Sequence, residues 1–494
     1  MRSRSGSKSY GINFPMVARI VGWLLMIEGA FMVFPLVTCL IYDESDYMSF
    51  LITTVLTIGM GALMTTYIRP NRNNMGKREG FLLTSLVWVV FSCFGMLPFM
   101  LCTSPLGLSD AFFEAMSGFT TTGASVLTSI EHFSHGIHLW RCLIQWIGGM
   151  GIILFTLAVI PMLNHSGGMQ MFNAEVTGIT HDKLRPRISS TAKGLWGIYI
   201  VLTIMLWVLL WCGPMNMFDS ICHALSSMST GGFSTSDQSI GAWDSLYVKI
   251  VITVFMFLGG VNFSLLFRAS TGDFRAVWLN DTFRAYIYII VATMILFVGA
   301  ITLQGQATSI EAVTIDPLFQ IISTITSTGY TVTNFENWGT FVLALVFVLM
   351  FFGACAGSTS GGAKIDRMLY LIKNLGNELK RCVHPNAIYS VRVNNKVIPS
   401  ELVNKVIAFL CLYVVLIMVG GLVLTATGLP LVDAFFSSFS CISNTGLGAG
   451  ITGYGGSYKL VPDIGKWILS LLMLIGRLEL FTVLILFTRS FWRK

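Results

Sequence analysis

The sequence predicts an all-α polytopic membrane protein, from its composition, its long apolar segments and a loop motif that occurs four times. Hydrophobic residues make up 54% of the 494-residue chain and charged residues only 11%, and the mean hydropathy is +0.73. A soluble domain carries about 25% charged residues, so this composition suits lipid rather than water. The apolar segments lack the period-2 alternation that the strands of a membrane β-barrel would show.

Ten apolar segments are close to the roughly 20 residues that a helix needs to cross the hydrocarbon core. They are residues 14–42, 49–69, 81–102, 138–163, 194–213, 246–267, 283–303, 339–357, 404–426 and 466–488. Helices are expected in all of them, because a segment in lipid must satisfy its own backbone polar groups. The first segment follows the basic stretch MRSRSGSK, and no small-residue cleavage site comes after it, so a retained helix is expected rather than a signal peptide.

Basic and acidic residues alternate between the loops that join these segments. The basic positions include Arg2, Arg4, Lys8, Arg69, Arg72, Lys77, Arg78, Lys183, Arg185, Arg187, Arg268 and Arg275, the stretch 364–405 and the final RSFWRK. The acidic positions include Asp43, Glu44, Asp46, Asp110, Glu131, Asp219, Asp237, Glu311, Asp316 and Asp433. By the positive-inside rule, both termini are expected in the cytoplasm. The basic residues of the loops expected on the cytoplasmic side therefore account for the net charge of +7, and no nucleic-acid partner is expected.

Four outer loops contain versions of one motif. They read DAFFEAMSGFTTTGAS (110–125), DSICHALSSMSTGGFS (219–234), DPLFQIISTITSTGYT (316–331) and DAFFSSFSCISNTGLG (433–448). Each begins with an aspartate and reaches a Thr-Gly pair, namely Thr122-Gly123, Thr230-Gly231, Thr328-Gly329 and Thr445-Gly446. The spacing from aspartate to glycine is thirteen residues in three copies and twelve in the second. A repeated unit of helix, pore loop and helix is therefore predicted.

The repeat divides the chain into five parts. We expect an N-terminal two-helix domain at 1–78, pore repeat 1 at 79–175, pore repeat 2 at 176–280, pore repeat 3 at 281–380 and pore repeat 4 at 381–494.

Each motif is expected to form a half-helix that enters the membrane from outside. About 11 helical residues span roughly 16 Å, which is half of a 30 Å hydrocarbon core. Asp110, Asp219, Asp316 and Asp433 are expected as N-caps that also attract cations to the outer mouth, with Pro317 at the first helical position. After Thr-Gly the chain must return as non-helical backbone, which at membrane depth has to line a cavity or be buried in protein. Four such returns could offer a ring of carbonyl oxygens to a monovalent cation, although small residues also serve simple helix packing.

The four loops, the segment GACAGSTSGGAK (353–364) and the segment GRLELFTVLILF (476–487) resemble the TrkH/TrkG/KtrB superfamily of potassium transporters. The resemblance covers nearly the whole chain and is closest to the bacterial TrkH branch. It implies a single-chain, pseudo-fourfold pore related to potassium channels, with two extra N-terminal helices. It also implies potassium uptake across the bacterial cytoplasmic (inner) membrane and the assembly of a homodimer. No cofactor is implied in this chain, because the nucleotide belongs to a cytoplasmic regulatory ring, TrkA.

The resemblance assigns the ion-binding filter to residues of the four motifs, which would hold potassium. They are Thr121, Thr122, Gly123, Thr230, Gly231, Thr328, Gly329, Thr445 and Gly446. In plant relatives a serine in the first filter accompanies sodium transport, so Gly123 favours potassium here. The loops keep little of the TVGYG of potassium channels beyond one glycine each, which implies looser discrimination between cations. Rubidium and caesium are therefore expected to pass as well as potassium.

The glycine-rich segment 353–364 interrupts what should be the last helix of the third repeat. The resemblance implies an intramembrane gate there, at Gly353, Gly357, Ser358, Gly361, Gly362 and Lys364, in a loop where relatives generally have glycine in place of Ala354 and Ser360. The alternative is a kink or a close helix contact, since each glycine weakens a helix by about 1 kcal/mol.

Arg477 is an arginine within the last apolar segment, where it must face protein or water. Glu479 is two residues away and does not share its helix face. The resemblance places Arg477 in the pore below the filter, where a fixed charge roughly 6 Å from a cation adds about 3 kcal/mol at an effective dielectric near 20. A salt bridge to another repeat is the alternative.

Two rival functions stay open at this point. A proton- or sodium-coupled secondary transporter of another small cation would have inverted repeats, whereas all four units here start inside. A membrane enzyme would need clustered intramembrane acidic or histidine residues, so no enzyme is expected. The sequence leaves open whether the protein is a symporter or channel-like, and which group faces the intramembrane Glu28. His132, His135 and His138 form a weak candidate for a metal site.

Overall fold

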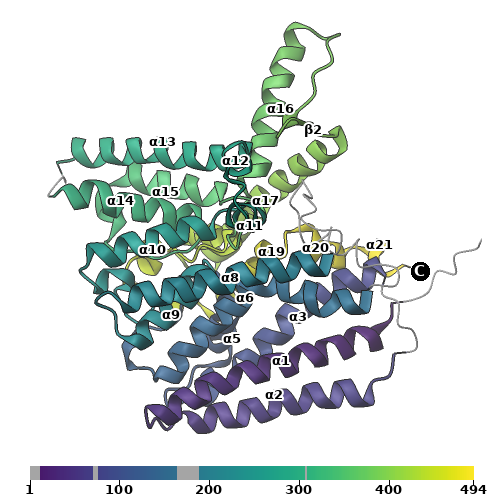
Figure 1. Ribbon diagram of the computed structural model, residues 1–494, viewed down its shortest axis with the longest axis vertical. Helices are drawn as coiled ribbons and strands as arrows, with labels where there is room; N and C mark the ends of the chain where they lie inside the picture. The colour runs from purple at the N-terminus through teal and green to yellow at the C-terminus, as the bar shows by residue number, and fades with distance from the viewer. Residues whose placement is uncertain (1–11, 71–75, 164–187, 306–308, 494) are drawn as a thin grey trace, which may run out of the picture.

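The computed structural model describes residues 12–70, 76–163, 188–305 and 309–493, and its architecture is shown in Figure 1. The basic residues expected on the cytoplasmic side at positions 2–8, 72 and 183–187 lie outside these ranges. The described part is a bundle of helices with one short hairpin, formed by β1 (Arg392–Val393) and β2 (Lys396–Val397). The expected all-α polytopic fold is confirmed.

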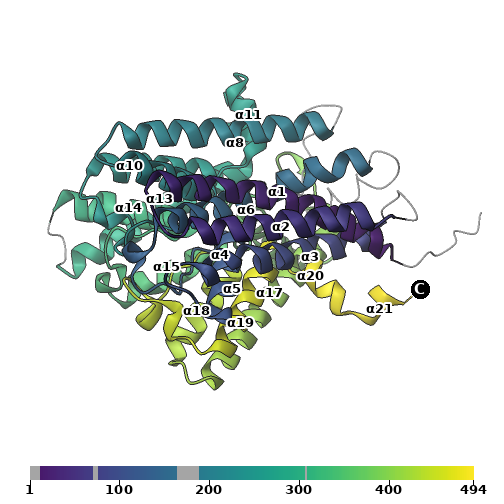
Figure 2. The same cartoon turned by 90° about the horizontal axis from the view of Figure 1, so that it is seen from below.

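An N-terminal helical hairpin precedes the repeats, formed by α1 (Phe14–Ile41) and α2 (Tyr47–Tyr67). The two helices cross closely at glycines, because a Cβ on Gly22 would lie 2.9 Å from the carbonyl oxygen of Gly61, and one on Gly61 would lie 2.6 Å from that of Gly22. Small residues bring membrane helices together in this way. Figure 2 shows the hairpin lying across one side of the bundle.

Each of the four repeats has a long first helix, a half-helix and a second membrane helix in this order, and further short or broken helices differ between the repeats. Repeat 1 contains α3 (Lys77–Gly95), α4 (Leu97–Leu101), α5 (Leu108–Phe119) and α6 (His135–Leu163). Repeat 2 contains α8 (Ile188–Trp211), α9 (Met217–Met228), α10 (Leu246–Gly259), α11 (Phe263–Ser270) and α12 (Phe274–Trp278). Repeat 3 contains α13 (Asp281–Leu303), α14 (Ile310–Ile325), α15 (Thr340–Phe352) and α16 (Ile365–Val383). Repeat 4 contains α17 (Ser400–Ala426), α18 (Leu431–Ser443), α19 (Asp463–Arg477), α20 (Phe481–Leu484) and α21 (Arg489–Trp492).

Three of the ten expected spanning helices are broken. Within the described residues, six helices are long and apolar enough to cross a membrane, and two bent pairs could add two more spans. The expected helix 246–267 bends by 106° between α10 and α11, and the expected helix 466–488 bends by 111° after α19. The expected helix 339–357 ends at Phe352. At the second bend Glu479 and Leu480 take positive φ values of 56° and 20°, which no continuous α-helix allows.

The start of α1, the start of α3 and the end of the chain lie on one side of the bundle (Figure 1). The backbone N–H of Asn13 donates to a Glu79 carboxylate oxygen at 3.1 Å, and Arg78 donates to the Arg493 carbonyl oxygen at 2.7 Å. This arrangement agrees with the alternation of basic and acidic loops.

The half-helices form, but the prediction of their first residues is wrong. Asp110, Asp219 and Asp433 are the third residues of α5, α9 and α18 rather than their N-caps, and α14 starts six residues before Asp316, with Pro317 in its interior. Upstream side chains cap two of these helices instead, since Asn216 accepts from the Asp219 N–H and Ser309 from the Ala312 N–H. A carboxylate in the first turn still stabilises the positive end of a helix.

Candidate functional site

The four loops that follow the half-helices meet in one closed ring. A Cβ built on Gly123 would lie 2.2 Å from the Gly231 carbonyl oxygen, and one on Gly232 would lie 1.9 Å from that of Thr328. One on Gly329 would lie 2.1 Å from the Thr445 oxygen, and one on Gly446 would lie 2.1 Å from the Thr122 oxygen. Each loop therefore touches the next in chain order, and the fourth touches the first. We call Thr122, Gly231, Thr328 and Thr445 the carbonyl ring.

The loops share one backbone conformation around the ring. The residue before each ring position has a positive φ, at 54° for Thr121 and Thr230, 55° for Ser327 and 53° for Asn444. The glycine after each ring position also has a positive φ, at 82° for Gly123, 84° for Gly232, 81° for Gly329 and 74° for Gly446. Only glycine adopts such a conformation at little cost. All four loops therefore have the same pair of positive-φ residues on either side of the ring position.

The predicted register of the second loop is wrong by one residue. Gly232, not Gly231, has the conformation of Gly123, and Gly231 takes the place of Thr122. The backbone hydrogen bonds agree, because the N–H groups of Thr122 and Gly231 donate to the carbonyl oxygens of Ser117 and Ser226 at 2.8 and 2.9 Å. The spacing from Asp219 to Gly232 is then thirteen residues, as in the other copies. The constant spacing was the signal that could have found Gly232, but the tandem Gly231-Gly232 concealed it.

A hydroxyl pair braces three of the four loops from within. The Thr122 hydroxyl lies 2.8 Å from that of Thr120, and the same distance separates Thr328 from Thr326 and Thr445 from Ser443. Because Gly231 has no side chain, the second loop cannot form this pair. The ring thus has fourfold backbone geometry but lacks fourfold side-chain symmetry.

A buried ion pair supports the loops of the ring, and no pattern in the sequence indicated it. Glu114 on α5 and Arg141 on α6 lie 2.8 Å apart, and both are fully buried. The Glu114 carboxylate also accepts from the backbone N–H of Val126, and Arg141 donates to the Ser234 carbonyl oxygen at 3.2 Å. The pair therefore ties the first half-helix to the chain returning from both the first and the second loop.

Two of the four leading aspartates join neighbouring repeats. Asp110 pairs with Lys466 on α19 at 2.5 Å, and Asp316 pairs with Lys249 on α10 at 2.9 Å. Asp219 accepts from the Thr235 hydroxyl at 2.6 Å and Asp433 from the Ile451 N–H at 3.2 Å. Lysine partners reduce the negative charge that Asp110 and Asp316 present to an approaching cation. Their attraction of cations stays a prediction.

The glycine-rich segment 353–364 is a non-helical loop between α15 and α16, as predicted. Positive φ values of 63°, 78°, 79° and 72° at Gly353, Gly357, Gly362 and Lys364 exclude a helix. Close packing explains two of these glycines, since a Cβ on Gly353 would lie 2.6 Å from the Gly361 carbonyl oxygen and one on Gly357 would lie 2.7 Å from the Asn262 side chain. The Ser358 and Ser360 hydroxyls lie 2.7 Å apart, and the Lys364 ammonium donates to the Ser360 carbonyl oxygen.

This loop lies directly against the filter loops. The Gly361 N–H donates to the Ser327 hydroxyl at 2.6 Å, and a Cβ on Gly361 would lie 2.2 Å from the Ser443 carbonyl oxygen. The Thr359 hydroxyl lies 3.3 Å from that of Thr230. The loop therefore touches the second, third and fourth filter loops. Thr359 was not among the predicted gate residues, because an isolated threonine carries no distinctive sequence signal.

Arg477 is the last residue of α19 and contacts the same loop. Its guanidinium donates to the Thr359 carbonyl oxygen at 2.9 Å and to the Gly148 carbonyl oxygen of α6 at 2.8 Å. Glu479 pairs instead with Arg367 on α16. A local pair between Arg477 and Glu479 was not expected, and Arg477 links loop 353–364 to the first repeat.

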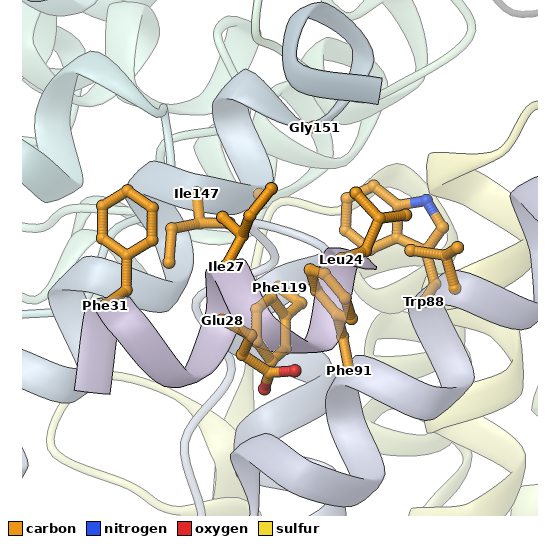
Figure 3. Close-up of a pocket in the computed structure, with 11 residues that line it drawn as sticks. Leu24, Ile27, Glu28, Phe31, Trp88, Phe91, Phe119, Ile147 and Gly151 are labelled. Atoms are coloured by element: carbon orange, nitrogen blue, oxygen red, sulfur yellow. The ribbon is translucent and has the colours of Figure 1, made fainter. Parts of the chain in front are cut away.

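Glu28 lies in a small cavity between the N-terminal hairpin and the first repeat (Figure 3). The lining is otherwise apolar and includes Phe91 of α3, Phe119 at the end of α5 and Ile147 of α6. Glu28 is fully buried, and neither carboxylate oxygen has a hydrogen-bond partner among the described residues. Two of the three histidines considered for a metal have other partners: His135 contacts Glu44 and His132 contacts Ser129.

The fold and the ring define a class of protein: a polytopic membrane protein in which one chain supplies four pore loops around a common axis. The comparisons with known proteins agree. The TrkH family, described as a cation transport protein, matches residues 46–494. The chain therefore belongs to the TrkH family.

Curated relatives match along almost their whole length. The Trk system potassium uptake protein TrkH of Escherichia coli K12 is 37% identical over 491 residues, covering 98% of this chain and 100% of that protein. The TrkG protein of the same organism is 32% identical, with coverage of 97% and 99%. The crystal structure of the potassium transporter TrkH from Vibrio parahaemolyticus superposes with a TM-score of 0.88 at 36% identity, covering 97% of this chain and 100% of that chain.

Proposed function

We propose that this protein takes up potassium ions across the bacterial cytoplasmic membrane through the carbonyl ring. The observation that carries the proposal is a closed set of contacts, in which the carbonyl oxygens of Thr122, Gly231, Thr328 and Thr445 each meet the glycine of the preceding loop around the ring. Carbonyl oxygens held at such close quarters can replace the hydration shell of a monovalent cation. The half-helices end at the same place, where their partially negative C-terminal ends favour a cation. The potassium transporters named above support potassium as the ion.

Loop 353–364 is the gate in this proposal. Its contacts with three filter loops support a position in the ion path below the ring, and the hydrogen bond from Arg477 to Thr359 supports a role for this arginine in holding the closed position. A fixed guanidinium near the path also repels cations. Opening would require Thr359 and Gly361 to leave their partners.

A homodimer and a cytoplasmic nucleotide-binding ring of the TrkA type complete the proposed assembly, with both termini in the cytoplasm. Figure 1 shows α16 projecting from the bundle. Its exposed apolar side chains recur at helical spacing, at Ile372, Leu375, Leu379 and Val383. An exposed apolar stripe of this kind is typical of an interface.

The test is rubidium flux into proteoliposomes, with potassium or sodium as competitor and with or without the cytoplasmic ring. Potassium should compete well and sodium poorly, and the ring with its nucleotide should change the flux. Equal competition by both ions would contradict the assignment to potassium. Flux that appears only with an imposed proton or sodium gradient would favour the coupled transporter instead.

A further inference from the structure

The second filter loop lacks the side chain that braces the other three. Thr122, Thr328 and Thr445 each place a hydroxyl 2.8 Å from another hydroxyl two residues earlier in the chain. At Gly231 there is no such group. The Ser229 hydroxyl, which would be the partner, keeps only its bonds to the half-helix, to the carbonyl oxygens of Leu225 and Ser226 at 3.0 and 2.9 Å.

A glutamine from another repeat occupies the vacant position. Gln145 lies on α6, is fully buried, and has its amide carbon 2.4 Å from where a Cβ of Gly231 would be. Its Nε2 donates to the Gly231 carbonyl oxygen at 2.7 Å. Its Oε1 accepts from the Ser226 hydroxyl at 2.7 Å and from the Phe233 N–H at 3.2 Å. One amide thus bonds to the half-helix, the ring position and the returning chain of the second repeat.

The contact with Gly231 changes the chemistry of the ring as well as its rigidity. The carbonyl oxygen of Gly231 is a ring member, because it also faces Gly123. An oxygen that accepts a hydrogen bond from an amide at 2.7 Å has less capacity left for a dehydrated cation than one without such a donor. The second repeat therefore contributes a weaker but more firmly positioned oxygen.

We propose that Gln145 is a positioning residue that replaces the missing threonine of the second filter and sets the discrimination between potassium and sodium. The proposal rests on the proposed function of the ring. Leucine at position 145 fills a similar volume without hydrogen bonds, so the Gly231 oxygen loses its donor and the Phe233 N–H its acceptor. The looser loop can then close around the smaller sodium ion.

The first test is the selectivity of Gln145→Leu. Sodium should inhibit rubidium flux at a concentration about tenfold lower than in the wild type, the effect expected from the loss of one well-made hydrogen bond. The matched control is Gln320→Leu, since Gln320 is also fully buried but bonds within its own half-helix, to Thr324 at 3.3 Å. An unchanged sodium inhibition in Gln145→Leu would overturn the proposal.

The second test restores a threonine at position 231 and removes the Gln145 amide that occupies its place. The backbone of Gly231 lies outside the left-handed region, so threonine can adopt it, but its Cβ would collide with Gln145. Gly231→Thr alone should therefore lose flux and melt at a lower temperature, and Gly231→Thr with Gln145→Ala should recover both. A double variant no better than Gly231→Thr would contradict the exchange. The melting temperatures of the two variants can be compared without any transport measurement. If the wild type carried no rubidium, the proposed function would be refuted, but the recovery of stability in the double variant could still be measured.

Discussion

Closure of the ring between the fourth and first loops can be tested by Gly446→Ala, with Gly455→Ala as the matched control. The two glycines have nearly the same φ, 74° and 71°, so alanine meets the same backbone strain of about 1–2 kcal/mol at both. Their surroundings differ. A Cβ on Gly446 would lie 2.1 Å from the Thr122 oxygen, 2.7 Å from the Gly123 carbonyl carbon and 2.8 Å from the Ala124 nitrogen, whereas one on Gly455 meets nothing within 4 Å.

Alanine at position 446 must therefore push backbone of the first loop away by about 1 Å, because a real Cβ contact is not closer than 3.0 Å. Overpacking of this kind costs about 1–3 kcal/mol. If this energy destabilises the conformation of the ring that conducts ions, the flux falls by roughly 5- to 150-fold. Gly455→Ala should keep its flux and lose only the stability that the backbone strain costs, about 1–2 kcal/mol.

The assay is initial rubidium uptake into proteoliposomes at equal protein content, with thermal unfolding in detergent as a check that both variants fold. Similar uptake and sodium competition in the two variants would refute the reasoning, since the contact between Gly446 and Thr122 would then be irrelevant to conduction.

Three further changes test the surroundings of the ring. Arg477→Ala should raise rubidium flux, because it removes the hydrogen bond to loop 353–364 and, on the proposed function, a charge barrier of about 3 kcal/mol; unchanged flux in vesicles would exclude this role. Glu114→Gln should destabilise the protein by about 3–5 kcal/mol, measured as a lower melting temperature, because it leaves the buried Arg141 without its counter-charge. Glu28→Leu should raise the melting temperature. A buried carboxyl without a hydrogen-bond partner among the described residues destabilises the folded protein by about 1–3 kcal/mol, and leucine removes this penalty. A lower melting temperature would contradict this reasoning.

Features that repeat along the chain were predictable from the sequence. Four motifs in register indicated four half-helices and a common axis, because chance repetition at such spacing is improbable. The break at 353–364 was visible in its glycines, and its conformation is confirmed by Gly353 and Gly357. Each of these predictions depended on local conformation, which nearby residues largely determine.

Features that depend on contacts between repeats were not predictable. Gln145 is an ordinary polar residue within an apolar helix until the structure places it beside Gly231, 86 residues further along the chain. The bend after Arg477 falls at Glu479 and Leu480, and neither residue type marks a break in a helix. The starts of the half-helices were misjudged because Asn216 and Ser309, a few residues upstream, compete as caps.

The last link of the ring has a consequence for how the protein is made. Gly446 meets Thr122, and the Asn444 amide donates to the Thr122 hydroxyl at 3.0 Å across 322 positions of the chain. During synthesis the first three loops enter the bilayer before the residues that seal them exist. A nascent chain therefore lacks the contacts between its fourth and first loops. On the proposed function, the complete ring that conducts ions forms only when translation is nearly finished.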